Sequence, residues 1–267
     1  MIFTHEKQTI NSNYQLYLPF MPTYLHDTIV PFKESSATKK KQVEEMFDKI
    51  AFRYDFLNHF LSAGIDVGWR KKAIKQLKEL NPKIVLDVAT GTGDVAILTY
   101  KMLKTEKIIG IDISAGMLEI GQKKIMELGS QNHIQLLKGD SETISFGDNT
   151  FDAVTVAFGV RNFENLEKGL QEILRVLRPG GKLVILEFSR PALPVIKNIY
   201  NFYLNVIAPK VGTIISKNKN AYKYLNDSVQ KFPERKIFIN ILNQLGYRNT
   251  LYKTLSLGIC SIYCGEK

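Results

Sequence analysis

The chain has 267 residues, 45% of them hydrophobic, which is enough for one large α/β domain with a core of its own. Its formal net charge of +10 is typical of proteins with an acidic partner (nucleic acid, anionic membrane or charged metabolite), and equally of proteins with a generally basic surface. The lysines are spread along the whole chain, with only Lys39 to Lys41 as a compact run, so a nucleic-acid partner receives little support. Two cysteines, Cys260 and Cys264, are too few for a disulfide framework or a four-ligand zinc site, and they favour free thiols in a reducing cytoplasm.

The start of the chain shows neither a targeting signal nor a clear hydrophobic period. No apolar run reaches the ~18 residues that span a bilayer. The first residues also lack the basic-then-apolar order of a secretory signal. We therefore expect a loosely ordered extension over residues 1–38.

Two helices are predicted before the first strand. Apolar residues recur at helical spacing over 39–63, and Gly64 then ends the first helix. A second helix covers about 66–80 and ends before an Asn-Pro pair. Together they are expected to form a helical cap over residues 39–80.

Strands and helices then alternate. Near-continuous apolar strands between amphipathic helices are typical of a parallel sheet covered on both faces. The last two strands suit a terminal antiparallel hairpin. We predict a single α/β domain over 39–267, with a mostly parallel seven-stranded sheet and an antiparallel strand near the C-terminus. The predicted strands are 83–88, 107–112, 134–139, 151–158, 182–188, 247–254 and 256–265.

A glycine-rich loop follows the first predicted strand. "GTGDVA", which contains Gly91, Thr92 and Gly93, fits the dinucleotide fingerprint, and Asp112 at the end of the next strand is placed to grip ribose hydroxyls. NAD, FAD and S-adenosylmethionine binders share this pattern. From the loop alone, an NAD-dependent oxidoreductase therefore remains an alternative.

Acidic residues around the loop discriminate between these cofactors. Asp87 ends the first strand, and Asp94 begins the helix after the loop. A pyrophosphate at a helix N-terminus is repelled by such anions, whereas the sulfonium and ammonium of S-adenosylmethionine are attracted by them. Asp94 is equally well explained as a helix cap. The acids together favour S-adenosylmethionine.

The third strand ends in another polar pair, Asp140 and Ser141, which can meet the adenine amino group. Here the chain resembles class I S-adenosylmethionine-dependent methyltransferases, in which polar residues after the first, second and third strands hold the cofactor. The resemblance implies their Rossmann-like fold. The chain departs from their pattern at Ala89, where glycine is preferred.

Longer stretches narrow the resemblance. "YDFLNHFLSAGIDVGW" and "RVLRPGGKLVILEFS" closely resemble the signatures of the ubiquinone/menaquinone quinol C-methyltransferases, and "FGVRN" is similar to another family segment. This implies C-methylation of demethylmenaquinol to menaquinol, or alternatively of 2-polyprenyl-6-methoxy-1,4-benzoquinol in ubiquinone biosynthesis. Asp66 stands where the family usually has histidine, Leu57 replaces methionine, and Ala157 replaces a serine found in some relatives.

Methylation of a quinol carbon requires alignment and stabilisation of a developing phenolate, but no metal. Arg161 and Asn162 follow the fourth strand, where ligands bind in such sheets, and we interpret them as catalytic; a helix-start salt bridge is the alternative for Arg161. Tyr54 is a third candidate, for contact with the ring or as a cover for the cofactor, although a core position is as consistent with its spacing. Of the histidines, only His59 lies in the signature helix, at a variable position.

Residues 190–232 interleave aromatic side chains with lysines and contain no predicted strand. A polyprenyl quinol is insoluble, so such an insert suits a lid that contacts the membrane surface peripherally from the cytoplasm. An ordinary pair of covering helices is the alternative. A homodimer is left open, and so is a non-catalytic scaffold subunit, although the intact cofactor loop argues against the latter.

Overall fold

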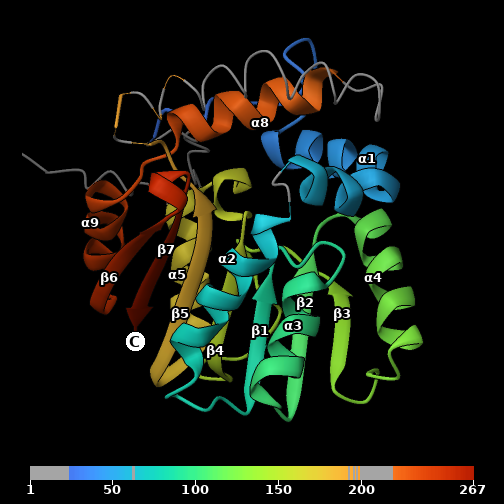
Figure 1. Cartoon of the computed structure of the whole chain (residues 1–267), viewed down its shortest axis with the longest axis vertical. Coiled ribbons are helices and arrows are strands. Elements are labelled where there is room, and N and C mark those ends of the chain that lie inside the picture. Colours follow the sequence, from blue (N-terminus) through green and yellow to red (C-terminus); the bar gives the residue numbers. More distant parts are fainter. Residues whose placement is uncertain (1–23, 62–63, 192, 195, 197, 199–218) are drawn as a thin grey trace, which may run out of the picture.

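The computed structural model describes residues 24–267, except 62–63, 192, 195, 197 and 199–218 (Figure 1). A seven-stranded sheet with the order β3-β2-β1-β4-β5-β7-β6 forms its centre. The strands from β3 to β5 are parallel, and β7 runs antiparallel to both β5 and β6. The predicted fold class is confirmed. The strands are β1 (Ile84–Val88), β2 (Lys107–Asp112), β3 (Ile134–Lys138), β4 (Phe151–Ala157), β5 (Leu177–Phe188), β6 (Arg248–Leu255) and β7 (Cys260–Glu266).

Helices cover both faces of this sheet because its strands alternate buried side chains between them. In β1, Val85 packs in a core with α2, α3 and α4, whereas the next residue, Leu86, packs in a core with α5 and α9. Both side chains are fully buried. The helices are α1 (Lys39–Leu61), α2 (Ile65–Ile74), α3 (Asp94–Leu103), α4 (Ala115–Glu127), α5 (Leu166–Val176), α8 (Lys219–Lys231) and α9 (Lys236–Gln244), with short 3₁₀ turns η1 (Lys75–Leu77), η2 (Val160–Asn162) and η4 (Ser256–Gly258).

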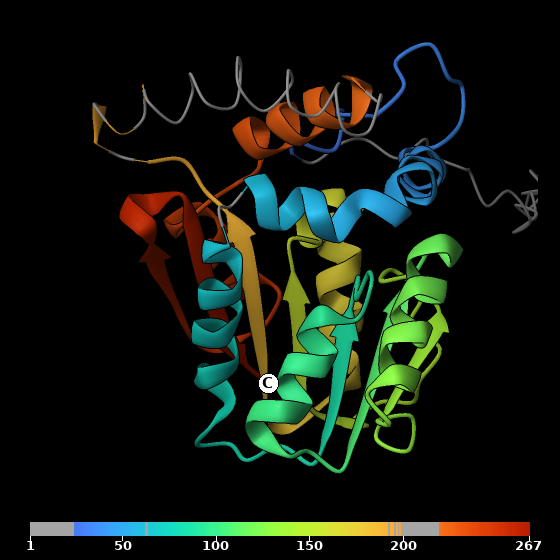
Figure 2. The ribbon, with the colours of Figure 1, turned by 45° about the vertical axis from the view of Figure 1, so that its right-hand side comes forward.

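Above the carboxyl ends of the parallel strands, α1 and α8 form a separate layer (Figure 2). Val43 and Met46 of α1 share a small apolar core with Ala221 and Tyr224 of α8. Asp48 fixes α1 to the start of α4, since its Oδ1 accepts hydrogen bonds from Ser114 Oγ at 2.6 Å and from a backbone N–H of α4. Helix α1 of the predicted cap therefore sits over the sheet edge where the polar residues gather, whereas α2 packs on one face of the sheet (Figure 2). No helix among the described residues is long and apolar enough to cross a bilayer.

The segment that precedes α1 corrects one expectation. Residues 24–38 are not loosely attached: His26 is fully buried, and its ring packs edge-on against Phe232 at 5.3 Å between centroids. The Tyr24 hydroxyl donates to Glu167 Oε1 at 2.6 Å. The partners of this segment lie far along the chain, and the segment forms no regular helix or strand. Its sequence therefore shows no hydrophobic period. Residues 1–23 lie outside the described part.

The strand that the sequence predicts over 182–188 begins earlier in the structure. Strand β5 begins at Leu177 and runs through "RPGG", with a register shift against β4 between Phe151 and Ala153. Gly180 has a φ of 77°, and a Cβ on Gly181 would lie 2.8 Å from the Arg178 carbonyl oxygen. The glycines therefore form a bulge within the strand rather than a turn before it.

Leu170, fully buried in α5, provides a test of the core. Leu170→Ala should lower the free energy of unfolding by about 2–5 kcal/mol, because it leaves a cavity between α5 and the sheet. Urea denaturation measures the loss. Lys168→Ala, at an exposed position of the same helix, is the control and should change stability little. Equal effects of the two changes would contradict this packing.

Candidate functional site

A cleft of about 640 Å³, open to solvent, lies where the carboxyl ends of β1, β2, β3 and β4 meet the underside of α1. Gly91 and Asp112 line it, as do Asp140, Ser141 and Asn162. These residues follow different strands, and the parallel sheet brings them to one edge, as the sequence predicts. Apolar side chains complete the wall. They are Val43, Phe47, Ile113, Met117, Phe158 and Phe163.

The glycine loop adopts backbone angles that side chains disfavour. Gly91 and Gly93 have φ values of 57° and 77°, and Gly93 is the N-cap residue of α3. Ala89 also has a positive φ, 54°, a conformation that glycine adopts at lower cost. Its methyl group lies against Gly159, where an added Cβ would stand only 2.6 Å away. The loops after β1 and β4 are thus in direct contact beside the cleft.

Asp87, at the end of β1, is almost fully buried. Its carboxylate accepts hydrogen bonds of 2.6 Å from the hydroxyls of Thr90 and Thr155. Burial raises the pKa of Asp87 to about 6, against the lowering effect of these hydroxyls. Asp87 faces a smaller chamber behind the cleft rather than the cleft itself. It is therefore a poorly solvated anion that a nearby cation would stabilise.

Asp112, at the end of β2, is held by the backbone. Its two oxygens accept from the N–H groups of Gly91 and Ser114, each at 2.8 Å. Burial raises the pKa of Asp112, and these N–H groups oppose that rise. The side chain reaches the cleft in a fixed orientation, so its remaining lone pairs can accept hydrogen bonds from a ligand.

Asp140 and Ser141, after β3, also line the cleft, but Asp140 has a partner that the sequence did not suggest. Lys40 of α1 donates to Asp140 Oδ2 at 2.6 Å and to Glu142 Oε2 at 3.2 Å. Glu142 in turn accepts from the backbone N–H groups of Glu164 and Asn165. The only sequence signal for this ion pair was the compact basic run to which Lys40 belongs. Nothing local pointed to Asp140 as its partner, because the two residues are 100 positions apart.

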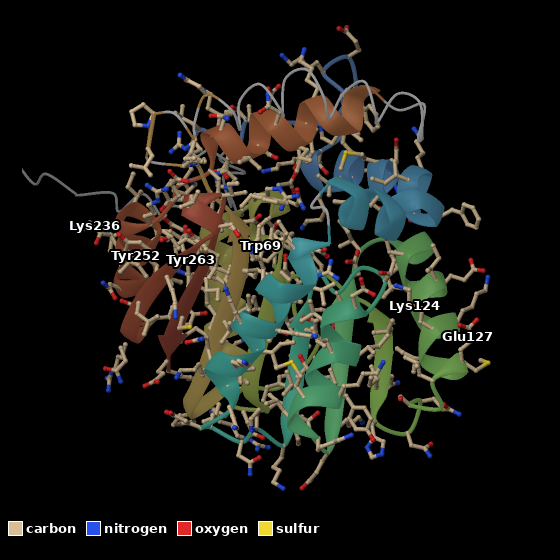
Figure 3. The ribbon with its side chains drawn as sticks, in the orientation of Figure 1. Trp69, Lys124, Glu127, Lys236, Tyr252 and Tyr263 are labelled. Atoms are coloured by element: carbon tan, nitrogen blue, oxygen red, sulfur yellow. The ribbon has the colours of Figure 1, made fainter. Side chains whose placement is uncertain are left out.

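Asp94 proves not to be a capping residue. Gly93 is the N-cap of α3, without a side-chain cap bond, and Asp94 forms ion pairs with Arg70 of α2 at 2.7 Å and Lys124 of α4 at 2.8 Å. Lys124 also donates to Thr92 Oγ1 at 3.0 Å. Burial alone would raise the pKa of Asp94, but both cations outweigh it and hold that pKa below its usual value. Figure 3 shows Lys124 on the opposite side of α3 from α2.

Arg161 lies in η2 and is buried, and the described residues that line the cleft do not include it. Its Nη1 donates to Glu187 Oε1 of β5 at 2.6 Å and to the Phe158 carbonyl oxygen. Glu187 is fully buried, and burial raises its pKa, opposed mainly by the positive charge of Arg161. Arg161 therefore forms a salt bridge, which was the alternative to a catalytic role for this residue. Sequence reasoning missed Glu187, although it lies within the second signature stretch.

Asn162 lines the cleft next to this pair. Its Oδ1 accepts from the Tyr224 hydroxyl of α8 at 3.0 Å, and its Nδ2 donates to the Phe158 carbonyl oxygen at 3.4 Å. The amide is thereby fixed from both ends. Tyr54 belongs to α1, but its side chain lies outside the described residues. Within the described part, no group of His, Cys, Asp and Glu residues is arranged to hold a metal ion.

The model of the ubiE/COQ5 methyltransferase family matches residues 35–267. The chain belongs to this family. It is 44% identical over 244 residues to the demethylmenaquinone methyltransferase of Bacteroides fragilis, covering 91% of this chain and 99% of that one. It is also 44% identical over 230 residues to the ubiquinone/menaquinone biosynthesis C-methyltransferase UbiE of Geotalea daltonii, covering 86% and 97%.

Solved structures share the fold. Phosphoethanolamine N-methyltransferase 2 of Haemonchus contortus, in complex with S-adenosyl-L-methionine, has a TM-score of 0.61 at 15% identity, covering 88% of this chain and 61% of that one. An S-adenosylmethionine-dependent methyltransferase of Thermotoga maritima has a TM-score of 0.57 at 19% identity, covering 84% and 99%. The predictions of family, enzyme class and S-adenosylmethionine as cofactor are confirmed. The cleft fits that cofactor, because carboxylates stand at the ends of β1, β2 and β3, and Lys40, the one cation among the described residues that line it, is paired with Asp140 and Glu142.

The pair of Arg161 and Glu187 yields a stability prediction. Glu187→Ala should lower the free energy of unfolding by about 3–5 kcal/mol, because it leaves the guanidinium buried without its counter-charge. The double change Arg161→Met with Glu187→Leu should recover most of this loss, since neither charge remains. Urea denaturation of the single and double variants forms the cycle. Glu119→Ala, which breaks the exposed pair with Lys123, is the control and should have little effect. A double variant as unstable as Glu187→Ala would refute the account.

Proposed function

We propose that the protein transfers a methyl group to a ring carbon of demethylmenaquinol, forming menaquinol in menaquinone biosynthesis. The relatives from Bacteroides fragilis and Porphyromonas gingivalis, at 44% and 42% identity over nearly the whole chain, carry the name demethylmenaquinone methyltransferase. The relatives named for both pathways keep the ubiquinone-pathway benzoquinol as the second candidate acceptor.

The observation that carries the proposal is the composition of the cleft. Carboxylates lie at one side of it, whereas Phe47, Phe158 and Phe163 give it an apolar wall and Asn162 supplies an amide beside that wall. An aromatic ring with hydroxyl groups matches such a wall, since its face is apolar and its edge needs a hydrogen-bond partner.

The polar side of the cleft is assigned to the cofactor. Asp112 is placed to accept from the ribose hydroxyls, with the glycine loop at Gly91 close by, and Asp140 with Ser141 to meet the adenine. Lys40 holds Asp140 in place and closes α1 over this side. Asp87 provides negative charge behind the loop, where the cationic groups of the cofactor are stabilised.

When bound, S-adenosylmethionine supplies an electrophilic methyl group. Asn162, fixed by Tyr224, orients a quinol hydroxyl or the water that takes its proton. The buried pair of Arg161 and Glu187 fixes the η2 turn and thereby the position of Asn162, whose amide N–H can stabilise a developing phenolate. Phe47 of α1, Phe158 and Phe163 pack against the face of the ring. Tyr54, also on α1, remains a candidate for contact with the ring.

Peripheral membrane contact is the remaining part of the proposal. Most of the predicted interfacial insert lies outside the described residues. Its described helix α8 packs Ala221 and Tyr224 inward and exposes Lys223 and Lys231. Exposed lysines on a helix in the layer above the strand ends (Figure 2) suit an anionic lipid surface. The homodimer stays a prediction.

The proposal is tested by methyl transfer from labelled S-adenosylmethionine to short-chain demethylmenaquinol. The reduced acceptor should be methylated, whereas the oxidised quinone should not, because its ring is electron-poor and has no hydroxyl proton to release. The benzoquinol is run in parallel and should be the slower acceptor. Cofactor binding without methylation of either quinol would refute the function, and equal rates on the oxidised and reduced naphthoquinone would refute the chemistry.

Asp87 predicts a pH dependence of cofactor affinity. Because its pKa is raised to about 6, Asp87 is ionised above that pH and protonated below it, and a cation beside it favours the ionised form. Affinity for S-adenosylmethionine should therefore be constant near neutral pH and fall below about pH 6, by up to about tenfold per pH unit. Calorimetry in the range of about pH 7 to about pH 5 measures it. Asp87→Asn should bind weakly and without this slope, whereas Asp112→Asn should bind weakly but keep it.

Asn162 offers a catalytic test. Asn162→Ala should reduce kcat by roughly 100-fold while cofactor affinity stays near that of the unmodified protein, because one preorganised polar contact is lost. Tyr224→Phe, which removes only the hydroxyl that holds the amide, should reduce kcat by roughly 3- to 10-fold. Single-turnover kinetics and calorimetry on the same preparations separate rate from binding. An Asn162→Ala variant with unchanged kcat would remove this residue from the mechanism.

A further inference from the structure

Behind the glycine loop, a second chamber of about 370 Å³ adjoins the cleft. The cleft and the chamber share lining residues from the loops after β1 and β4, namely Ala89, Gly91, Ala157 and Phe158. A molecule held in the cleft can therefore extend into the chamber past Gly91, which has no side chain to block the way. The volume of the chamber includes space that is open to solvent.

Charged side chains from different elements meet in this chamber. Asp87 comes from β1, Asp94 from α3 and Arg70 from the cap helix α2. Asp87 is 1% exposed and Arg70 7% exposed, so both charges are shielded from water. A buried cation and buried anions around one small space suit a ligand group that carries both signs of charge, as an α-amino acid does.

Arg70 retains capacity for an anion. It forms ion pairs through Nη1 with Asp94 at 2.7 Å and through Nη2 with Asp66 at 3.3 Å. A guanidinium has five N–H donors, more than these contacts use. Its Nε is buried and has no hydrogen-bond partner among the described residues. Such an unsatisfied charged donor is costly, and a carboxylate is the group that it binds best.

Asp66 explains how Arg70 is held. It lies one helical turn earlier in α2, is 3% exposed, and contacts the guanidinium from the side of the cap. The acid therefore sets the orientation of the arginine.

We propose that Arg70 binds the α-carboxylate of the cofactor's methionine moiety in this chamber, and that Asp66 positions Arg70 for it. The ammonium of the same moiety then lies on the side of Asp87. The inference rests on the proposed placement of the cofactor in the cleft and is independent of which quinol is methylated. It makes the cap helix α2 part of the cofactor site.

The test compares S-adenosylmethionine with its decarboxylated form, which keeps the sulfonium and an ammonium and lacks only the carboxylate. Calorimetry on the unmodified protein should show about 10- to 100-fold tighter binding of the complete cofactor, the size of one charge-assisted contact. Arg70→Met should reduce this ratio to near one. Lys71→Gln removes a neighbouring exposed charge that does not line the chamber, and should leave the ratio unchanged. Asp66→Asn should give an intermediate ratio.

The ratio of the two affinities distinguishes a role of Arg70 in carboxylate binding from a role in folding. A purely structural Arg70 would weaken both ligands equally or lower the melting temperature, and the ratio would persist in Arg70→Met; that result would overturn the inference. An unmodified protein that binds both forms equally would also overturn it. Failure of the proposed function would look different, because both cofactor forms would still bind with the expected ratio while neither quinol received a methyl group.

Discussion

Desolvation of acidic side chains is the constraint on which the rest of this structure depends. Parallel strands deliver Asp87, Asp112 and Glu187 to the same edge of the sheet. Asp87 and Glu187 are buried, and Asp112 is half-buried in the wall of the cleft. A carboxylate with little access to water needs hydrogen-bond donors that are fixed parts of the protein. Each receives a different kind: hydroxyls at Asp87, backbone N–H groups at Asp112, and a guanidinium at Glu187. The loops around the cleft are shaped by these requirements.

The helical cap belongs to the same electrostatic system. Lys40 and Asp48 on α1, and Arg70 on α2, reach down to the loop after β3, the start of α4 and the start of α3. Helix α1 is therefore attached to the sheet edge mainly through charged side chains, and its apolar residues Val43 and Met46 pack against α8. Helix α2 also packs Trp69 and Ala73 into the core on one face of the sheet. Trp69 adds a link to the C-terminal hairpin, since its Nε1 donates to Ser256. The same contacts of α1 and α2 consequently hold both the region proposed for the cofactor and the region proposed for the acceptor.

Local signals account for what the sequence could predict. Strand periodicity, the glycine loop and the acids at strand ends lie within short windows, and they placed Asp87, Asp112 and Asp140 at the correct edge. Pairings between distant residues carry no local signal: Lys40 meets Asp140 across 100 residues, and Arg161 meets Glu187 across 26. For this reason Arg161 was assigned as a residue facing the acceptor, whereas it lies buried against β5. The packing of residues 24–38 was missed for the same reason, because His26 is buried by partners from the far end of the chain.

The alanine in the glycine loop has a thermodynamic consequence. Ala89 holds a left-handed backbone angle at a cost on the order of 1 kcal/mol, and its methyl group fills the space left by Gly159. A glycine there would leave the loop freer in the unfolded chain and freer in the folded one. The alanine therefore lowers the conformational entropy that the loop loses on folding, which offsets part of the cost of the left-handed angle. The contact between Ala89 and Gly159 restricts the folded loop beside the cleft, so less of its freedom is left to be lost when a ligand binds.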